Sequence, residues 1–235
     1  YSTKEDLSLV EDIYPASYLQ IGMLFESIMN TNRTYLNISL YQLKLHFDSN
    51  KFMRVWNGLV KKHALLRAKF TMSDNSYDCV IYKEVEIKYS LYHDYNPNDL
   101  IEAEYLTSFD YSKPGLFRLI VNTYNDISNK FDLLLSFHHA IEDGWSFASL
   151  INEFITVYNS DGRVTGNINL SYGEFVALEQ TIIKDNAQLT FWQNYLSDIS
   201  IPTIRWKQYK KLRSVNSLYT KNIILDELAS NKAFA

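Results

Sequence analysis

Apolar positions repeat at helical spacing in two segments of the chain. In segments 49–63 and 146–158 the apolar side chains recur at i, i+3, i+4, i+7 and i+8, or close to it, which indicates a helix with one buried face. The positions are Phe52, Val55, Trp56, Leu59 and Val60 in the first segment and Phe147, Leu150, Ile151, Phe154, Ile155 and Tyr158 in the second. We expect both stripes to lie in the hydrophobic core.

The other expected elements follow from alternation, caps and turn residues. Ser17 can cap a helix and Pro97 can open one, while 159–170 contains glycines and is expected to be a loop. Further helices are expected over 17–29, 97–107, 172–184 and 186–196. Strands are expected over 36–47, 66–72, 78–84, 86–92, 116–124 and 130–138. Strands mixed with helices in this order indicate an α/β fold, in which helices cover a mixed β-sheet.

Composition excludes several classes of protein. The 235 residues, 46% of them hydrophobic, suffice for one large domain or for a domain plus part of another. The net charge of −4 gives no general attraction to nucleic acid, and no apolar run reaches the roughly 18 residues of a membrane span. The single Cys79 cannot form an internal disulfide, and the spaced ligands of a zinc site are missing. We therefore expect a cytoplasmic protein without nucleic-acid or membrane partners.

The most informative stretch is 138–146, which reads His-His-Ala-Ile-Glu-Asp-Gly-Trp-Ser. Two adjacent histidines end an apolar strand, and an Asp-Gly turn leads into a helix. Neighbouring side chains of a strand point to opposite faces, so one ring can support the fold while the other faces a cleft. Histidine has an unperturbed pKa of about 6.5, which suits proton transfer near neutral pH. The alternative is a strand that ends in two solvated histidines beside an ordinary turn.

This stretch resembles the His-His-x-x-x-Asp-Gly motif of condensation domains in nonribosomal peptide synthetases, which have a chloramphenicol acetyltransferase-like fold. The fixed positions of the motif are filled by His138, His139, Asp143 and Gly144, and the match extends through Trp145 and Ser146. Three further segments resemble the family in the right order, namely 14–25, 62–70 and 109–119. The resemblance implies that each lobe of the fold is a mixed β-sheet covered by helices.

The resemblance implies a catalytic role for His139. In the family, the α-amino group of a carrier-bound acceptor attacks the thioester carbonyl of a carrier-bound donor. An α-amino group has a pKa near 8, so a strong base is not needed to create the nucleophile. What remains is to orient the amine and to remove a proton as the tetrahedral adduct forms. His139 is expected to do both, while His138 is expected to pack and to form hydrogen bonds.

The other motif residues are expected to be structural. The resemblance implies that Asp143 pairs with Arg67, which would brace the histidine loop as a buried ion pair. Gly144 would permit a close backbone approach, because a side chain there would block it. Trp145 is expected to lie beneath the loop, and Glu142 is expected to be solvated.

The resemblance also implies that the chain is one part of a larger unit. Residues 1–196 match the N-terminal lobe, and residues 197–235 would form the crossover and the start of a truncated C-terminal lobe, with a strand over 217–225. The active site would lie between the lobes, so the chain alone is expected to be inactive. It would need no cofactor of its own, because its substrates arrive on the phosphopantetheine of carrier domains. The expected partners are the missing C-terminal lobe, the upstream donor and downstream acceptor peptidyl carrier domains, and an adenylation domain.

Two other functions remain open. A coenzyme A-dependent acyltransferase of the same superfamily would use the same His-x-x-x-Asp-Gly chemistry, although segments 17–25 and 63–70 favour the synthetase. A non-catalytic lobe for carrier docking is a second alternative, against which the intact His139 argues. A cyclising relative is disfavoured, because it would carry aspartates in place of the two histidines.

Overall fold

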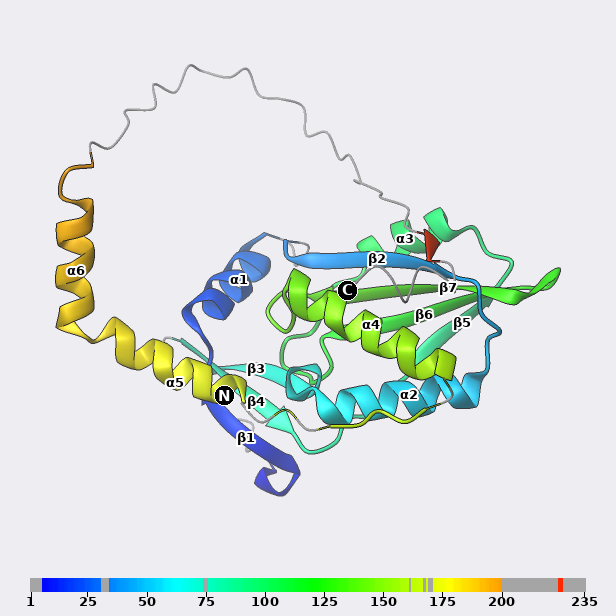
Figure 1. Cartoon of the computed structure of the whole chain (residues 1–235), viewed down its shortest axis with the longest axis horizontal. Coiled ribbons are helices and arrows are strands. Elements are labelled where there is room, and N and C mark those ends of the chain that lie inside the picture. Colours follow the sequence, from blue (N-terminus) through cyan, green and yellow to red (C-terminus); the bar gives the residue numbers. More distant parts are fainter. Residues whose placement is uncertain are drawn as a thin grey trace, which may run out of the picture.

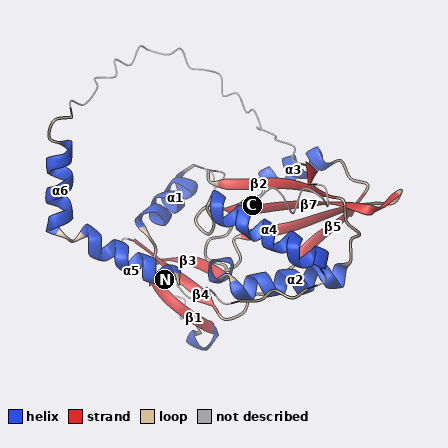
Figure 2. Ribbon diagram, viewed as in Figure 1, coloured by secondary structure: helices blue, strands red, loops and turns tan. Residues whose placement is uncertain are grey.

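The computed structural model describes residues 6–30, 34–73, 76–160, 162–166, 168, 171–199 and 224–225. Its helices are α1 (Tyr18–Met29), α2 (Ser49–Lys62), α3 (Pro97–Tyr105), α4 (Gly144–Ser160), α5 (Tyr172–Ile183) and α6 (Asn186–Leu196). Its strands are β1 (Val10–Pro15), β2 (Leu36–Leu43), β3 (Ala68–Ser73), β4 (Ser76–Tyr82), β5 (Tyr89–His93), β6 (Phe117–Tyr124), β7 (Ile127–His138) and β8 (Ile224–Leu225). Short 3₁₀ helices span Leu7–Leu9 and Ala64–Arg67. The predicted α/β class is confirmed (Figure 2).

The larger sheet has five strands in the order β5-β6-β7-β2-β8 and is mixed. β5 runs parallel to β6 and β8 parallel to β2, whereas β7 pairs antiparallel with both of its neighbours. Helices α2 and α4 cross one face of this sheet, and α3 packs against β2 and β7 from the other (Figure 1). β7 is therefore a central strand covered on both sides, which explains why its second half is almost continuously apolar.

The interface between the sheet and the two long helices is aromatic. Trp56 of α2 stacks on Phe117 of β6 and on Phe154 of α4, with ring centroids 6.3 and 5.1 Å apart. Phe147, in the first turns of α4, stacks on Phe137 of β7 at 4.5 Å. Both predicted apolar stripes therefore lie in the core. These rings fix the start of α4 against the end of β7, and the motif is the short connection between them.

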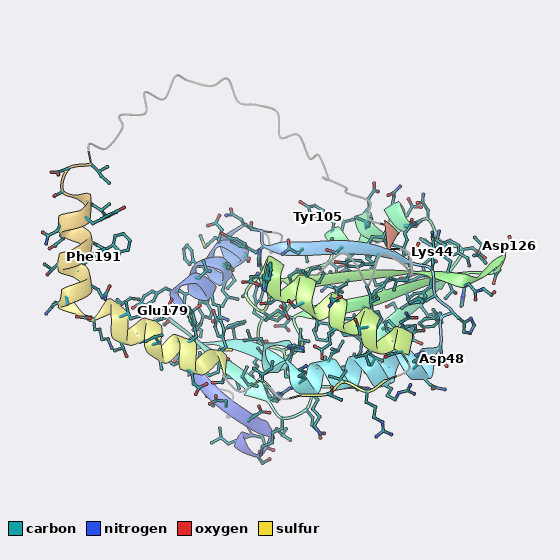
Figure 3. The ribbon with its side chains drawn as sticks, viewed as in Figure 1. Lys44, Asp48, Tyr105, Asp126, Glu179 and Phe191 are labelled. Atoms are coloured by element: carbon teal, nitrogen blue, oxygen red, sulfur yellow. The ribbon has the colours of Figure 1, made fainter. Side chains whose placement is uncertain are left out.

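A second, antiparallel sheet has the order β1-β4-β3. α1 follows β1 directly, and α5 packs against β1. The backbone N–H of Tyr18 donates to Glu179 on α5 at 3.2 Å, which ties α5 to the start of α1 (Figure 3). α6 continues from α5 away from both sheets (Figure 1).

The structure differs from the expected elements in several bounds. The strands fall into two sheets, and β1 has no counterpart among the expected strands. The strand expected from residue 66 begins at Ala68, because residues 64–67 form a 3₁₀ turn in which the N–H of Leu66 donates to the carbonyl of His63. Of the strand expected over 217–225, only Ile224–Leu225 lies within the described residues. Most of the expected segment 197–235 likewise lies outside them.

Candidate active site

His138 is a buried, neutral histidine at the end of β7. It is fully buried, and its ring lies edge-on to Tyr111 at 4.9 Å. The backbone N–H of Ala140 donates to Nδ1 at 3.2 Å, so the proton of the neutral ring is on Nε2, which donates to Ser27 Oγ at 2.9 Å. Burial, and then the proximity of His139, lowers the pKa of His138 to about 4. His138 therefore packs and forms hydrogen bonds in the uncharged state.

His139 takes the opposite tautomer. Its Nδ1 lies 2.6 Å from the backbone carbonyl of Glu142, and a carbonyl oxygen can only accept, so Nδ1 carries the proton. Nε2 is then the basic nitrogen, with its lone pair available. The half-buried ring lies edge-on to Tyr35 and Phe137, both at 6.4 Å, and its backbone N–H donates to the carbonyl of Tyr35. This is the arrangement of a general base whose second ring nitrogen is oriented by an acceptor.

Two buried side chains of helix α1 form hydrogen bonds to residues 138–140. The side-chain amide of Gln20 donates to the carbonyl of Ala140 at 2.9 Å, and Ser27 accepts from His138 while it donates to the carbonyl of Thr34 at 2.7 Å. Gln20 also completes a capping box with Ser17 at the start of α1. Ser27 and Gln20 are seven residues apart, two helical turns, so one face of α1 contacts both ends of the segment 138–140.

The expected pair between Arg67 and Asp143 is wrong. Arg67 donates to the carboxylate of Glu11 at 2.6 Å and to the carbonyl of Val60 at 2.9 Å, and it also binds the carbonyl of Tyr82. Its side chain is only 5% exposed, so these partners take the place of the water molecules that would otherwise solvate the guanidinium group. Arg67 therefore joins α2 and β4 to β1 and does not form its ion pair with Asp143.

Asp143 instead caps α4. Its carboxylate accepts from the backbone N–H of Ser146 at 2.7 Å, and its carbonyl accepts from the N–H of Phe147. Hydrogen bonds from Ser146, first of all the one from its backbone N–H, lower the pKa of the exposed Asp143 carboxyl. An aspartate at the N-cap of a helix stabilises its first turn, so Asp143 fixes where the motif ends and the helix begins.

We expect the Arg67→Ala and Asp143→Ala substitutions to act independently. Arg67→Ala leaves buried carbonyl groups unpaired and should cost on the order of 3 kcal/mol of unfolding free energy. Asp143→Ala removes a helix cap and should cost about 1 kcal/mol. Chemical denaturation of the two single variants and the double variant measures their coupling. A coupling energy above about 0.5 kcal/mol would contradict the separate roles, because distant sites are additive within that range.

A Cβ atom built on Gly144 meets nothing within 4 Å among the described residues, and the backbone of Gly144 is not in the left-handed region. No group of the described chain requires glycine there, and the expected close approach to this backbone stays a prediction. Another expectation for the motif is wrong. Trp145 does not lie beneath the loop: it is 84% exposed. The reason is helical spacing, because Trp145 stands two residues before Phe147 and so points away from the buried stripe of α4. The start of α4 is open to solvent.

Glu142 is buried, whereas it was expected to be solvated. Its side chain lines a small cavity between α2, the large sheet and α4, and its Oε2 atom has no hydrogen-bond partner among the described residues. Burial, and then the charge of Asp143, raises the pKa of the Glu142 carboxyl to about 7. The carboxyl of the residue whose backbone orients His139 therefore keeps its proton to a higher pH than an exposed glutamate does.

The family profile of the condensation domain matches residues 10–227, which is most of the chain. The chain belongs to the condensation-domain family. The AMB antimetabolite synthetase AmbE of Pseudomonas aeruginosa is 29% identical over 206 residues, which cover 80% of this chain and 10% of that protein. The hydroxamate-type ferrichrome siderophore peptide synthetase of Schizosaccharomyces pombe is 24% identical over 215 residues, which cover 86% of this chain and 4% of that protein. The chain spans a tenth or less of these relatives.

Solved condensation domains have the same fold. The starter condensation domain of rhizomide synthetase superposes with a TM-score of 0.66 at 13% identity, over 82% of this chain and 52% of that one. The first condensation domain of the calcium-dependent antibiotic synthetase, in complex with a substrate analogue, gives 0.64 at 14% identity, over 82% and 49%. The chain thus corresponds to about half of each of these solved chains.

Several residues around the motif of this condensation domain were not anticipated. Three residues outside the motif contact the two histidines, namely Ser27, Tyr35 and Tyr111. Glu11 forms the ion pair with Arg67. Gln20 and Tyr111 lie in the segments 14–25 and 109–119 that resemble the family, although no contact with the histidines was expected of either. The contacts of Ser27, Tyr35 and Glu11 arise through tertiary structure, which local patterns do not encode.

The described residues offer no site for a metal ion, since no group of three or more His, Cys, Asp or Glu side chains gathers among them. Within the same part of the chain, no helix combines the length and apolar character needed to cross a membrane.

Proposed function

We propose that this chain is the N-terminal half of a peptide-bond-forming condensation domain in a nonribosomal peptide synthetase, with His139 as the residue that accepts the proton. The observation that carries the proposal is the tautomer of His139. Its Nδ1–H is held by the carbonyl of Glu142, so the basic Nε2 is left for a substrate. The neighbouring His138 has both ring nitrogens occupied and is buried. Only one histidine of the pair can therefore take a proton from a substrate.

The proposed reaction depends more on the positioning of the two substrates than on a strong base. The acceptor's amine nitrogen attacks the donor's thioester carbon, and a C–N bond forms as the carbonyl becomes an oxyanion. Nε2 of His139 takes one proton from the resulting ammonium group, the C–S bond then breaks, and the proton passes to the departing thiolate of the donor's phosphopantetheine. A proton acceptor placed in this way contributes typically about 10²–10⁴-fold. The chain needs no cofactor of its own for these steps.

In this proposal, substrates reach His139 over the solvent-exposed surface at the start of α4. Asp143 holds the first turn of α4, while the free space over Gly144 leaves room for a phosphopantetheine arm to pass close to the backbone. His139 lies just before the N-terminal end of this helix. In this proposal Gly144 is required by the substrate rather than by the fold of the lobe.

The missing half of the domain would cover the apolar surfaces of α5 and α6. Large side chains are exposed there, including Phe191 on α6 (Figure 3). The others are Phe175, Leu178, Ile182, Ile183, Leu189, Trp192, Tyr195 and Leu196. Many large apolar side chains exposed on two successive helices favour an interaction site there. We propose that residues 1–196 form the N-terminal lobe, that 197–235 lead into the C-terminal lobe, and that donor and acceptor carrier domains and an adenylation domain act with them.

The experiment is a condensation assay of the complete parent domain with two kinds of donor. One donor is an aminoacyl thioester on its carrier domain and the other is the same acyl group on coenzyme A, each offered with a carrier-bound acceptor or a free amine. We expect amide product from the carrier-bound pair and far less from coenzyme A with a free amine. Preferred turnover of the coenzyme A thioester would contradict the proposal and favour a soluble acyltransferase.

A further inference from the structure

One face of helix α5 packs against β1 and the start of α1 (Figure 1). Tyr172, Val176 and Glu179 recur at helical spacing along this face, and Val176 is only 1% exposed. A Cβ atom built on Gly173 would lie 2.8 Å from the ring of Tyr14 on β1, so a larger side chain would push α5 away from the strand. The opposite face of α5 carries exposed apolar side chains.

A series of hydrogen bonds leads from this face of α5 to the histidine motif. The hydroxyl of Tyr172 and the Oγ atom of Ser17 are 3.1 Å apart. Ser17 Oγ accepts from the backbone N–H of Gln20 at 3.2 Å, and the side-chain oxygen of Gln20 accepts from the N–H of Ser17 at 2.9 Å. The side-chain amide of Gln20 then donates to the carbonyl of Ala140 at 2.9 Å. Three side chains thus connect α5 to the residue that follows His139.

The middle of this series is excluded from solvent. Ser17 is fully buried and Gln20 is 3% exposed, while Tyr172 is half-buried. Burial, first of all, raises the pKa of Tyr172, so its hydroxyl keeps its proton at neutral pH. Because Ser17 is buried, solvent does not readily supply a substitute for the Tyr172 hydroxyl. Removal of that hydroxyl is therefore expected to loosen Ser17 and, with it, Gln20.

The carbonyl of Ala140 belongs to the turn that orients His139. The ring Nδ1–H of His139 donates to the carbonyl of Glu142, three residues further along the chain. Between them, the peptide group of Ala140 and Ile141 is held at both of its polar atoms. Its N–H donates to the carbonyl of His138 at 3.1 Å, and its carbonyl accepts the amide from α1. The direction of this peptide group therefore sets where the acceptor of the ring proton lies.

We propose that Tyr172 is a positioning residue for His139, and that it acts through Ser17 and Gln20. The helix whose apolar face is proposed to meet the other half of the domain thus holds the histidine turn with its opposite face. This rests on the proposed function for the catalytic use of His139 only, because the orientation of the ring can be measured without any reaction.

The test compares Tyr172→Phe with Tyr158→Phe in the complete parent domain. Each change removes one oxygen atom and keeps the ring. The hydroxyl of Tyr158, on α4, accepts from the N–H of Asp48 at 2.8 Å and donates to the carbonyl of His46 at 2.9 Å, so this control also breaks hydrogen bonds between elements. Both kcat and KM are measured with a carrier-bound acceptor. The ¹⁵N NMR signals of the His139 imidazole report its tautomer, and melting temperatures are recorded in parallel.

We expect Tyr172→Phe to lower kcat by about tenfold and to change KM by less than about twofold, since misplacing a reacting group by roughly 1 Å can cost about 10²-fold. The share of neutral His139 with its proton on Nδ1 should fall in the same variant. Gln20→Met should lower both quantities further. Adding Tyr172→Phe to Gln20→Met should change little, because the series is already broken. Tyr158→Phe should keep the wild-type kcat and tautomer.

The NMR measurement decides the positioning role. An unchanged His139 tautomer in Tyr172→Phe, or an equal change in Tyr158→Phe, would overturn the proposal. If the tautomer changed as expected while kcat did not, the catalytic role of His139 would fail and the positioning role would stand. If Gln20→Met did not fold, the comparison of the two Tyr→Phe variants would still decide the matter.

Discussion

The 235-residue chain on its own is expected to be almost inert in peptide-bond formation, even when both carrier domains are supplied loaded. Its own core is extensive, with α2, α4 and the large sheet buried against one another, so we expect it to fold. The expected loss of activity comes from the lost orientation of the two substrates. With one wall of the proposed active site absent, neither phosphopantetheine arm is held in line with His139. Orientation of two reactants can lower a barrier by roughly 7–11 kcal/mol, far more than one proton transfer contributes.

A condensation assay with this chain alone, beside the complete parent domain, measures this loss. Adding the second half as a separate polypeptide should restore part of the activity if it binds the apolar surfaces of α5 and α6. Turnover by the chain alone comparable with that of the complete domain would mean that one lobe suffices. The two-lobe proposal would then fail.

The helices were the most predictable part of the fold. The stripes of 49–63 and 146–158 were recognisable because one face of each helix packs on the aromatic surface of the sheet, as Trp56 and Phe147 do. The division of the strands into two sheets was not recognisable. Alternation shows that a segment is a strand and which side chains share a face, but it does not show which strand lies beside it. β1 pairs with β4, far along the chain, by contacts that no local pattern encodes.

At the site, the sequence predicted that the two histidine rings face opposite ways, but it did not predict which residues the site side chains contact. The two histidines do face opposite ways, since His138 meets Tyr111 and Ser27 while His139 meets Phe137 and Tyr35. Arg67 was expected to be buried and paired, yet its partner is Glu11. Glu142 was expected in solvent because a carboxylate in a short loop usually is. The side chain of Glu142 instead lines a cavity that Phe147 of α4 also lines.

His139→Ala should abolish most of the activity of the complete parent domain without unfolding it. The ring is only half-buried and makes one side-chain hydrogen bond, so little packing is lost. The proton acceptor, however, is lost altogether, because His138 is fully buried with both ring nitrogens engaged and cannot substitute. General-base assistance of this kind is worth about 10²–10⁴-fold in rate.

The most direct measurement is therefore the rate of dipeptide formation on loaded carriers by His139→Ala, with melting temperatures recorded for each variant. His93→Ala is the matched control, since His93 is exposed on β5 and its ring bonds Thr123. We expect His139→Ala to fall by about 10²–10⁴-fold at an unchanged melting temperature and His93→Ala to keep the wild-type rate. A correctly folded His139→Ala variant that forms dipeptide at a near-normal rate would contradict the assignment of His139 as the proton acceptor.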